Sequence, residues 1–293
     1  MKHLVYYLLL GMGFPCFAQK PTIDQLRTSI VSKLGHIEGD FAVAFKDLQT
    51  QQTLFINEKE NFHAASTMKT PVMMEVFRQA QAGKFNLSDS ILVKNEFKSI
   101  VDGSPFKLDI SDDSADDMYK KIGSKMTIYD LTYQMMIVSS NLATNILIDL
   151  VDAKKANQFM RELGAKDINV LRGVEDTKAF EKGLSNTTTA YDLMLIFEKI
   201  AQKKVVSPTA SDKMIQILLD QKFNEIIPAQ LPSNVRVAHK TGSITGVRHD
   251  SGIVYLPNGK AYVLVLLSKK LTNPEAGVKA MAEVSEMIYN FVK

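Results

Sequence analysis

The spacing of apolar residues near the start of the chain changes from that of a helix to that of a strand. From residue 23 to residue 34 they recur every three or four positions, and Gly35 follows as a stop signal, which predicts an amphipathic helix. Over 41–45 they alternate with smaller or polar residues, and 53–57 has a similar character. These two segments are therefore predicted to be strands.

The middle of the chain is predominantly helical. A helix that contains Ser66 is predicted to end near Gly83, and residues 127–165 form a strongly helical block. Residues 88–126 between them are polar, and their acidic run DISDDSADD is predicted to be a solvated loop. A loop over 169–186 then leads into two further helical segments.

The end of the chain returns to the alternating pattern of strands. Strands are predicted over 235–243, 249–256 and 261–268, with a tight Asn-Gly turn between the last two, and a final helix follows over 275–291. Strands at both ends with helices between them predict an α/β (α+β) fold. In that fold one antiparallel sheet is built from both chain ends, with flanking helices and a helical insert.

Length and composition allow one large domain or two small ones. The chain has 293 residues, of which 45% are hydrophobic and 23% charged, so it can bury a sizeable core. We expect a single domain over 19–293, with its sheet part at about 19–62 and 234–293 and its helical part at about 63–233. The formal net charge of +3 is too small for the electrostatic footprint of a nucleic-acid-binding protein, so no nucleic acid partner is expected.

Residues 1–18 have the features of a secretory signal peptide. One lysine precedes an apolar stretch too short to span a bilayer comfortably, and small residues end the segment, which predicts cleavage near Gln19. The alternative is that Cys16, the only cysteine, is a lipidation site, although the residues before it do not resemble a lipobox. We expect a soluble, periplasmic or secreted monomer without a disulfide and without stable membrane association.

Ser66 and Lys69 place a hydroxyl and an amine three positions apart in a predicted helix. Residues at this spacing share a face, so a lysine of lowered pKa could take the serine's proton and make it a nucleophile. The Ser-x-x-Lys pattern is short, however, and Ser104 with Lys107 matches it as well. Taken alone, the pattern is therefore weak support for a catalytic pair.

Two further short motifs occupy suggestive positions. The sequence SSN from Ser139 stands at a break between helices, where it could simply be a helix cap, and KTG from Lys240 stands on a late strand. Other catalytic arrangements fit poorly, because the five histidines lack metal-ligand spacing and no Gly-x-Ser-x-Gly elbow occurs. His63 lies near Ser66 and could imitate part of a catalytic triad, but its position favours a loop or cap residue. We expect neither a metal nor a cofactor.

In this order, the three motifs resemble those of the class A serine β-lactamases and, more broadly, of the penicillin-recognising serine enzymes. The resemblance covers nearly all of the mature chain, and the segment HKTGSITGVRHD is particularly close. It implies a β-lactamase/transpeptidase-like fold. Two departures stand out: Ser140 occupies the place where the family usually has aspartate, and the mid-chain loop is shorter than usual.

The resemblance implies catalytic roles for three residues. Ser66 would attack the amide carbonyl of a β-lactam and form an acyl-enzyme, with Lys69 as its base and Ser139 as the proton relay to the leaving nitrogen. A second buried cation, Lys240, is expected to lower the pKa of Lys69 by like-charge repulsion. Backbone N–H groups of Ser66 and Ser243 would form the oxyanion hole.

The resemblance also implies how substrate is held. Asn141 would bind the side-chain amide of the substrate. Because the substrate carries a carboxylate, Lys240, Thr241 and Ser243 would bind that group from one strand. Arg248 either adds a bidentate contact from the neighbouring strand or forms a surface ion pair.

Hydrolysis of the acyl-enzyme depends on the loop LRGVEDTKAFEKG. The family places a glutamate there to activate water, usually with an asparagine four residues later. Glu175 takes the glutamate's place, but Ala179 stands four residues later, and Asp176 is an alternative base.

The favoured function is hydrolysis of the β-lactam amide bond of penicillin- or cephalosporin-type antibiotics, which confers resistance. One alternative is a penicillin-binding D-Ala-D-Ala peptidase-like serine hydrolase. Such an enzyme would be acylated by β-lactams but would release them slowly. Another is a non-catalytic β-lactam or muropeptide sensor. A small-molecule β-lactam is the partner expected.

Overall fold

The computed structural model describes residues 20–293, so the predicted signal peptide lies outside the described residues. Its centre is a five-stranded antiparallel sheet with the strand order β2-β1-β11-β10-β9. The strands are β2 (Thr53–Ile56), β1 (Asp40–Asp47), β11 (Ala261–Lys269), β10 (Val247–Tyr255) and β9 (Arg236–Ile244). The two chain ends thus meet in one sheet, as the sequence predicts, and the predicted fold class is confirmed.

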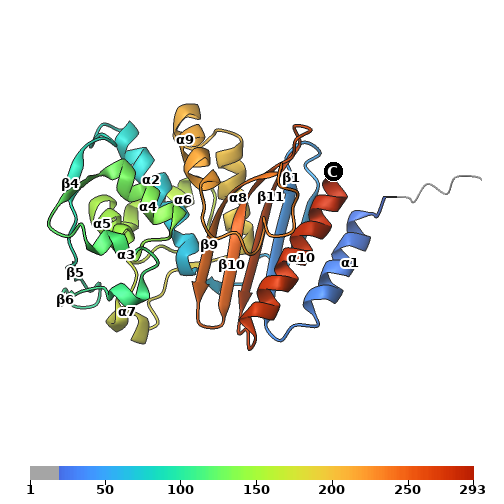
Figure 1. Ribbon diagram of the computed structural model, residues 1–293, viewed down its shortest axis with the longest axis horizontal. Coiled ribbons are helices and arrows are strands. Elements are labelled where there is room, and N and C mark those ends of the chain that lie inside the picture. Colours follow the sequence, from blue (N-terminus) through green and yellow to red (C-terminus); the bar gives the residue numbers. More distant parts are fainter. Residues whose placement is uncertain (1–19) are drawn as a thin grey trace, which may run out of the picture.

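Helices bury both faces of this sheet. Figure 1 shows α1 (Ile23–Leu34) and α10 (Pro274–Val292) side by side against one face, while α8 (Ala190–Ala201) packs on the other. The alternation along β1 divides its side chains accordingly. Phe41, Val43 and Phe45 belong to the core beneath α1 and α10, whereas the smaller Ala42 and Ala44 belong to the core shared with α8. The predicted strand therefore has two buried faces.

The first helix has the boundaries that its sequence predicts. Thr22 caps its N-terminus, and Gln25 completes a capping box by accepting a hydrogen bond from the Thr22 backbone N–H. Gly35 follows its last residue and donates its N–H to Val31. Within residues 20–293, every helix is too short or too polar to cross a bilayer.

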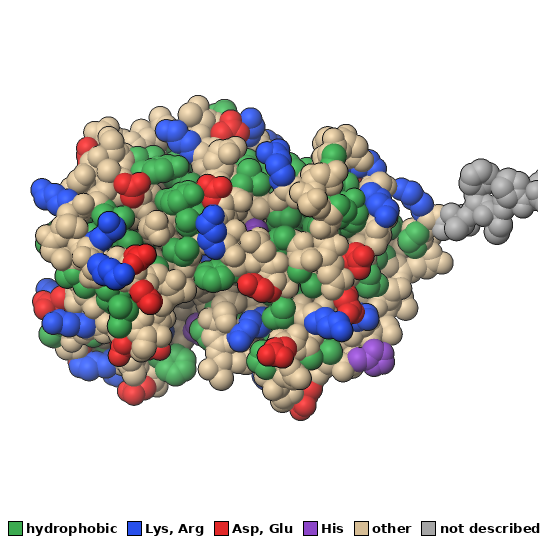
Figure 2. All heavy atoms as spheres, in the orientation of Figure 1, with side chains coloured by type: hydrophobic (Ala, Val, Ile, Leu, Met, Phe, Trp, Pro, Cys, Tyr) green, Lys and Arg blue, Asp and Glu red, His purple; other side chains and the backbone are tan. Residues whose placement is uncertain are grey.

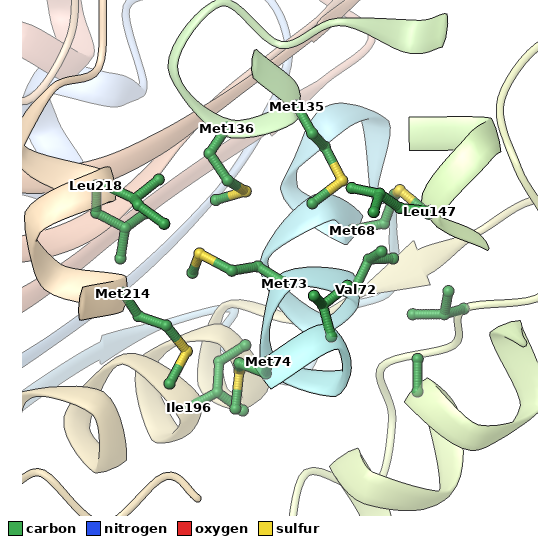
Figure 3. Packing of buried hydrophobic residues seen from close by; sticks show 14 of the residues in the cluster. Met68, Val72, Met73, Met74, Met135, Met136, Leu147, Ile196, Met214 and Leu218 are labelled. Carbon is green, nitrogen blue, oxygen red and sulfur yellow. The ribbon is translucent and has the colours of Figure 1, made fainter. Parts of the chain in front are cut away.

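The helical insert is organised around α2 (Lys69–Gln81). Figure 3 shows its side chains surrounded by residues from α4 (Ile128–Ile137), α5 (Asn141–Val151), α8 and α9 (Pro208–Leu219). Many of the contacting side chains are methionines, which are flexible enough to fill irregular gaps between helices. The labelled residues of this core are Met68, Val72, Met73, Met74, Met135, Met136, Leu147, Ile196, Met214 and Leu218. Another helix, α6 (Ala153–Glu162), also packs on α2.

Short elements join these parts. They are β3 (Phe62–His63), η1 (Ala65–Met68), β4 (Ser90–Leu92), β5 (Phe97–Lys98), β6 (Pro105–Phe106), η2 (Ile110–Asp112), α3 (Asp116–Tyr119), β7 (Lys125–Thr127), α7 (Thr177–Glu181) and β8 (Thr187–Thr188). The predicted helix around Ser66 begins as the 3₁₀ turn η1 and continues directly into α2.

The acidic run in the polar segment differs from its prediction. Most of its aspartates are exposed, but Asp113 is only 7% exposed. The prediction of a wholly solvated loop is wrong at this position, because the Asp113 carboxylate accepts hydrogen bonds from backbone N–H groups. On the face shown in Figure 2, positive and negative side chains are interspersed without an extended patch of one sign.

Candidate active site

Ser66 lies on η1, where the helical insert meets the sheet. The edge strand β9 passes close to this turn because residue 242 is a glycine. A Cβ at Gly242 would lie 3.2 Å from the backbone nitrogen of Ser66 and 3.2 Å from the Cβ of Ala65. Only a glycine allows this approach without displacing the turn. The KTG motif thereby lies beside the proposed nucleophile.

Two histidines support the turn. The backbone N–H of Ala65, a residue with a φ of 44°, donates to His63 Nδ1 at 3.0 Å. His249 Nε2 donates to the carbonyl oxygen of His63 at 2.9 Å, and His249 Nδ1 accepts from the Ser268 N–H at 3.2 Å. Burial lowers the pKa of His249 to about 4, and burial also lowers the pKa of His63. Both imidazoles therefore act structurally as neutral groups.

Lys69 is fully buried, and its amine contacts the break between α4 and α5. Nζ donates to Ser139 O at 2.6 Å, to Ser139 Oγ at 3.1 Å and to Asn141 Oδ1 at 2.9 Å. Ser66 is not among its hydrogen-bond partners within residues 20–293. The i, i+3 spacing thus places the two side chains on one face without pairing them directly.

Lys240 is the second buried amine. Its Nζ donates to Ser139 Oγ at 3.0 Å and to Thr241 O at 2.9 Å. The Ser139 hydroxyl oxygen therefore lies between the amines of Lys69 and Lys240.

The pKa of Lys69 is lowered to about 7, chiefly by burial, and the charges of Asp113 and Glu175 oppose the shift. The pKa of Lys240 is lowered well below its usual value, first by burial and then by the charge of Lys69. The expectation that like-charge repulsion from Lys240 lowers the pKa of Lys69 is therefore corrected. Removal from water disfavours the ammonium form directly, and the like-charge repulsion acts on Lys240.

Asn141 connects the lysine to the loop carrying Glu175. While its Oδ1 accepts from Lys69, its Nδ2 donates to Glu175 Oε1 at 2.7 Å and to Asp112 O at 3.1 Å. Burial is the largest cause raising the pKa of Glu175, and the Asn141 hydrogen bond opposes it. The amide predicted to hold substrate thus bridges an amine and a carboxyl group.

Asn145 positions the same loop, and sequence reasoning missed it. Its Oδ1 accepts from the Val174 N–H at 2.7 Å, and its Nδ2 donates to Val174 O at 3.0 Å. These bonds hold Val174, the residue directly before Glu175. Glu175 itself has a φ of 62°. The available signal was position, because Asn145 follows Asn141 by one helical turn on α5.

Asp176 has a different role from the one considered for it. Its buried carboxylate accepts from Ser99 Oγ at 2.8 Å, from the Ile100 N–H at 2.9 Å and from the Ala179 N–H at 3.1 Å. It therefore caps α7 and ties the loop to the 99–100 turn. Ala179, which stands where the family usually has asparagine, is fully buried.

These side chains border two adjoining cavities. The larger, of about 880 Å³, is lined in part by Ser66, Ser139, Asn141, Thr241, Ser243 and Arg248. The smaller, of about 550 Å³, shares Ser66, Asn141 and Ser243 and adds Glu175. Of the residues predicted as catalytic or substrate-binding, Lys69 and Lys240 lie behind this surface and the other seven line it.

Arg248 and the second Ser-x-x-Lys match are also resolved by the geometry. Arg248 Nη1 donates to the carbonyl oxygens of Ile244 and Val247 at 2.8 Å each, and no ion pair within residues 20–293 includes it. The surface ion-pair alternative is therefore wrong for the described residues.

The second Ser-x-x-Lys match, Ser104 with Lys107, forms no buried pair. Ser104 Oγ donates to Asp102 at 2.6 Å, whereas Lys107 is exposed.

A sheet built from both chain ends, with a helical insert and a serine turn at their junction, defines a protein of the β-lactamase/transpeptidase fold. The chain belongs to the beta-lactamase enzyme family, whose sequence model matches residues 24–292. The resemblance seen in the motifs is thereby confirmed. The family supports a hydrolase that acts on β-lactams.

Known proteins similar to this chain extend over nearly its full length. Beta-lactamase VEB-1 from Pseudomonas aeruginosa is 23% identical, and the alignment covers 98% of this chain and 97% of that protein. The crystal structure of a beta-lactamase from Sphaerobacter thermophilus has a TM-score of 0.77 at 25% identity, covering 92% of this chain and 97% of that one. A mutant of PBP-A, solved as an acyl-enzyme complex with penicillin G, has a TM-score of 0.77 at 26% identity with the same coverage.

Proposed function

We propose that the chain is an exported serine β-lactamase that opens penicillins and cephalosporins through an acyl-enzyme on Ser66. One observation carries the proposal: Ser139 Oγ lies 3.1 Å from Lys69 Nζ and 3.0 Å from Lys240 Nζ beside the cavity that Ser66 lines. A hydroxyl between two buried amines of lowered pKa is suited to pass a proton near neutral pH. Membership of the family supports the β-lactam substrate.

In the acylation step, Ser66 Oγ bonds to the β-lactam carbonyl carbon and its proton passes to the neutral amine of Lys69. The ring C–N bond then breaks, and the nitrogen receives a proton through Ser139 Oγ. Because the pKa of Lys69 is about 7, the acylation rate should rise with pH through that value. The N–H groups of Ser66 and Ser243 would stabilise the oxyanion.

In the deacylation step, Glu175 takes a proton from water, the water oxygen attacks the ester, and Ser66 Oγ leaves and is reprotonated. The hydrogen bond from Asn141 and the two bonds from Asn145 to Val174 support this role, because they hold the carboxyl group at the cavity. The peptidase-like alternative shares every step except efficient deacylation. The PBP-A acyl-enzyme complex is the observation that keeps this alternative open.

Covalent labelling tests the nucleophile. Ser66→Ala should abolish labelling by penicillin in intact-mass spectra, because it removes the attacking oxygen. Ser104→Ala, in the second Ser-x-x-Lys match, is the control and should be labelled like the wild type. The reverse pattern would contradict the assignment.

Export, a monomeric state and a role in resistance belong to the same proposal. The leader-like pattern of residues 1–18 supports export, and membership of the beta-lactamase enzyme family supports a role in resistance. Intact-mass analysis of the exported protein should give a chain that begins at or near Gln19. A chain that retains residues 1–18, or a lipid on Cys16, would contradict the proposed cleavage.

A further inference from the structure

Asp113 contacts the Ser139–Asn141 turn from a separate segment of the chain. Its Oδ2 accepts from the Leu142 N–H at 2.9 Å and from Ser140 Oγ at 3.4 Å, and its Oδ1 accepts from the Ala115 N–H at 3.1 Å. Leu142 lies in the first turn of α5, where the helix dipole and the free N–H groups favour a carboxylate. The carboxylate thus fastens the start of α5 to the 109–115 segment.

These contacts matter because the turn itself lacks a carboxylate. Ser140 stands where the resembled motif usually has aspartate. Its hydroxyl caps α5 by accepting from the Ala143 N–H at 3.2 Å, and it can donate its own proton to Asp113. The carboxylate at this turn is therefore supplied by Asp113 of the 109–115 segment.

The turn held in this way contains all three acceptors of the Lys69 amine. They are Ser139 O, Ser139 Oγ and Asn141 Oδ1, and Ser139 has a φ of 58°, which a serine adopts only at a cost. Asp113 binds Ser140, which directly follows Ser139, and Leu142, which directly follows Asn141. Loss of these bonds would release the segment that directly follows the strained residue Ser139.

We propose that Asp113 is a positioning residue, which fixes the Ser139–Asn141 turn against the amine of Lys69. The expected effect of Asp113 on acylation rests on the proposed function. Its role in holding the Ser139–Asn141 turn does not. The charge of Asp113 supports it, since that charge opposes the lowering of the Lys69 pKa and raises the pKa of Glu175. Further titratable groups near it are Tyr119 of α3 and the carboxyl groups of Asp109 and Asp112.

The test compares Asp113→Asn with Asp116→Asn, a control that removes an exposed carboxylate from the same acidic run. One measurement is the rate of Ser66 labelling by penicillin across pH, and the other is the NMR titration of Lys69 with ¹³C-labelled lysine. Asp113→Asn should slow labelling by about 10- to 100-fold and move both the acid limb and the Lys69 midpoint to lower pH. Asp116→Asn should change neither quantity.

A swap variant separates positioning from general structural support. Asp113→Ser combined with Ser140→Asp returns the carboxylate to the turn, so labelling should recover to within a few-fold of the wild type. If Asp113→Asn folds and keeps the wild-type rate and Lys69 midpoint, the inference is overturned. Loss of folding in both variants would also overturn it, because Asp113 would then support the fold alone.

The two proposals fail in different ways. If penicillin does not label the wild type on Ser66, the proposed function is wrong. The Lys69 titration then still decides the role of Asp113. A lower midpoint in Asp113→Asn with an unchanged midpoint in Asp116→Asn would support the positioning role, and equal midpoints in all three proteins would overturn it.

Discussion

Burial, more than any single charge, gives the side chains of the site their chemistry. Lys69 and Lys240 are both fully buried, and removal from water lowers the pKa of each amine. Glu175 is partly buried, and the same effect raises its pKa. An amine that is partly neutral near pH 7 and a carboxyl group held beside it by Asn141 suit two successive proton transfers.

The first residue-level prediction concerns deacylation. Glu175→Gln should still be acylated on Ser66 but should hydrolyse the adduct about 10² to 10⁴ times more slowly, because the amide cannot accept a proton from water. Mass spectrometry would follow the adduct over time. Glu181→Gln, an exposed substitution on α7, is the control. Turnover of penicillin by Glu175→Gln at the wild-type rate would exclude Glu175 as the base.

A second residue-level prediction concerns the substrate carboxylate. Arg248 lines the cavity, and its guanidinium is proposed to bind the substrate carboxylate through a charge-assisted hydrogen bond. Arg248→Ala removes that bond and should therefore mainly raise KM, by about 10- to 100-fold. Steady-state kinetics would measure the change. Arg236→Ala, at the exposed start of β9, should leave KM unchanged. Unchanged kinetics in Arg248→Ala would mean that its bonds to backbone carbonyls are its whole role.

At the scale of elements, α5 organises the site from its first two turns. Three of its residues contact three different segments. The cap residue Ser140 binds Asp113, just after η2, and Asn141 binds both η2 and Lys69 of α2. Asn145 binds the Glu175 loop at Val174. Successive helical turns present side chains on one face, so one element can hold several loops in register.

The helix α5 therefore gives an element-level prediction. Asn145→Ala should lower the free energy of unfolding by about 1–3 kcal/mol and slow deacylation more than acylation, because it frees Val174 next to Glu175. Urea unfolding and single-turnover kinetics would measure both effects. Asn157→Ala removes a bond to the same loop at Val170, and it should destabilise the protein without a selective effect on deacylation. Equal effects on deacylation in the two variants would contradict the positioning of Glu175 by Asn145.

Local patterns predicted the elements far better than the contacts between them. The helix over 23–34 and the late hairpin were predictable because spacing and turn residues lie within a few positions. The contact between Asp113 and the 140–142 turn was not, because Asp113 lies in a run of similar aspartates and nothing local distinguishes it. For the same reason, the sequence could not tell that Lys69 contacts Ser139 instead of Ser66.

At the scale of the whole molecule, the site lies where the helical insert meets the edge strand of the sheet. One core fills the space between the sheet and the pair α1 and α10, and the other joins the opposite face of the sheet to the helical insert. His249 of β10 joins the sheet to β3 through the carbonyl oxygen of His63. A neutral, fully buried imidazole therefore lies at this junction.

This histidine predicts a pH dependence of stability. Its pKa is about 4 in the folded protein and about 6.5 when unfolded, so the unfolded state binds more protons between those values. The stability that the neutral His249 imidazole contributes is fully present above about pH 6.5 and is lost as the pH falls towards 4. Between pH 7.5 and pH 5 the contribution of His249 should fall by about 2 kcal/mol.

Urea unfolding of the wild type and of His249→Gln at both pH values would measure this contribution. The variant should lose less stability on acidification, because glutamine does not titrate. An equal loss in both proteins would mean that other groups account for the acid sensitivity.

The central claim is that the chain turns over β-lactams through Ser66, and a time course with a chromogenic cephalosporin tests it most directly. The purified mature protein is mixed with a large excess of substrate, and the product is counted per molecule of enzyme. We predict that absorbance rises continuously through many equivalents, and that Ser66→Ala gives no rise above the uncatalysed rate. A burst of one equivalent followed by a plateau would contradict the claim and favour the peptidase-like or sensor alternatives.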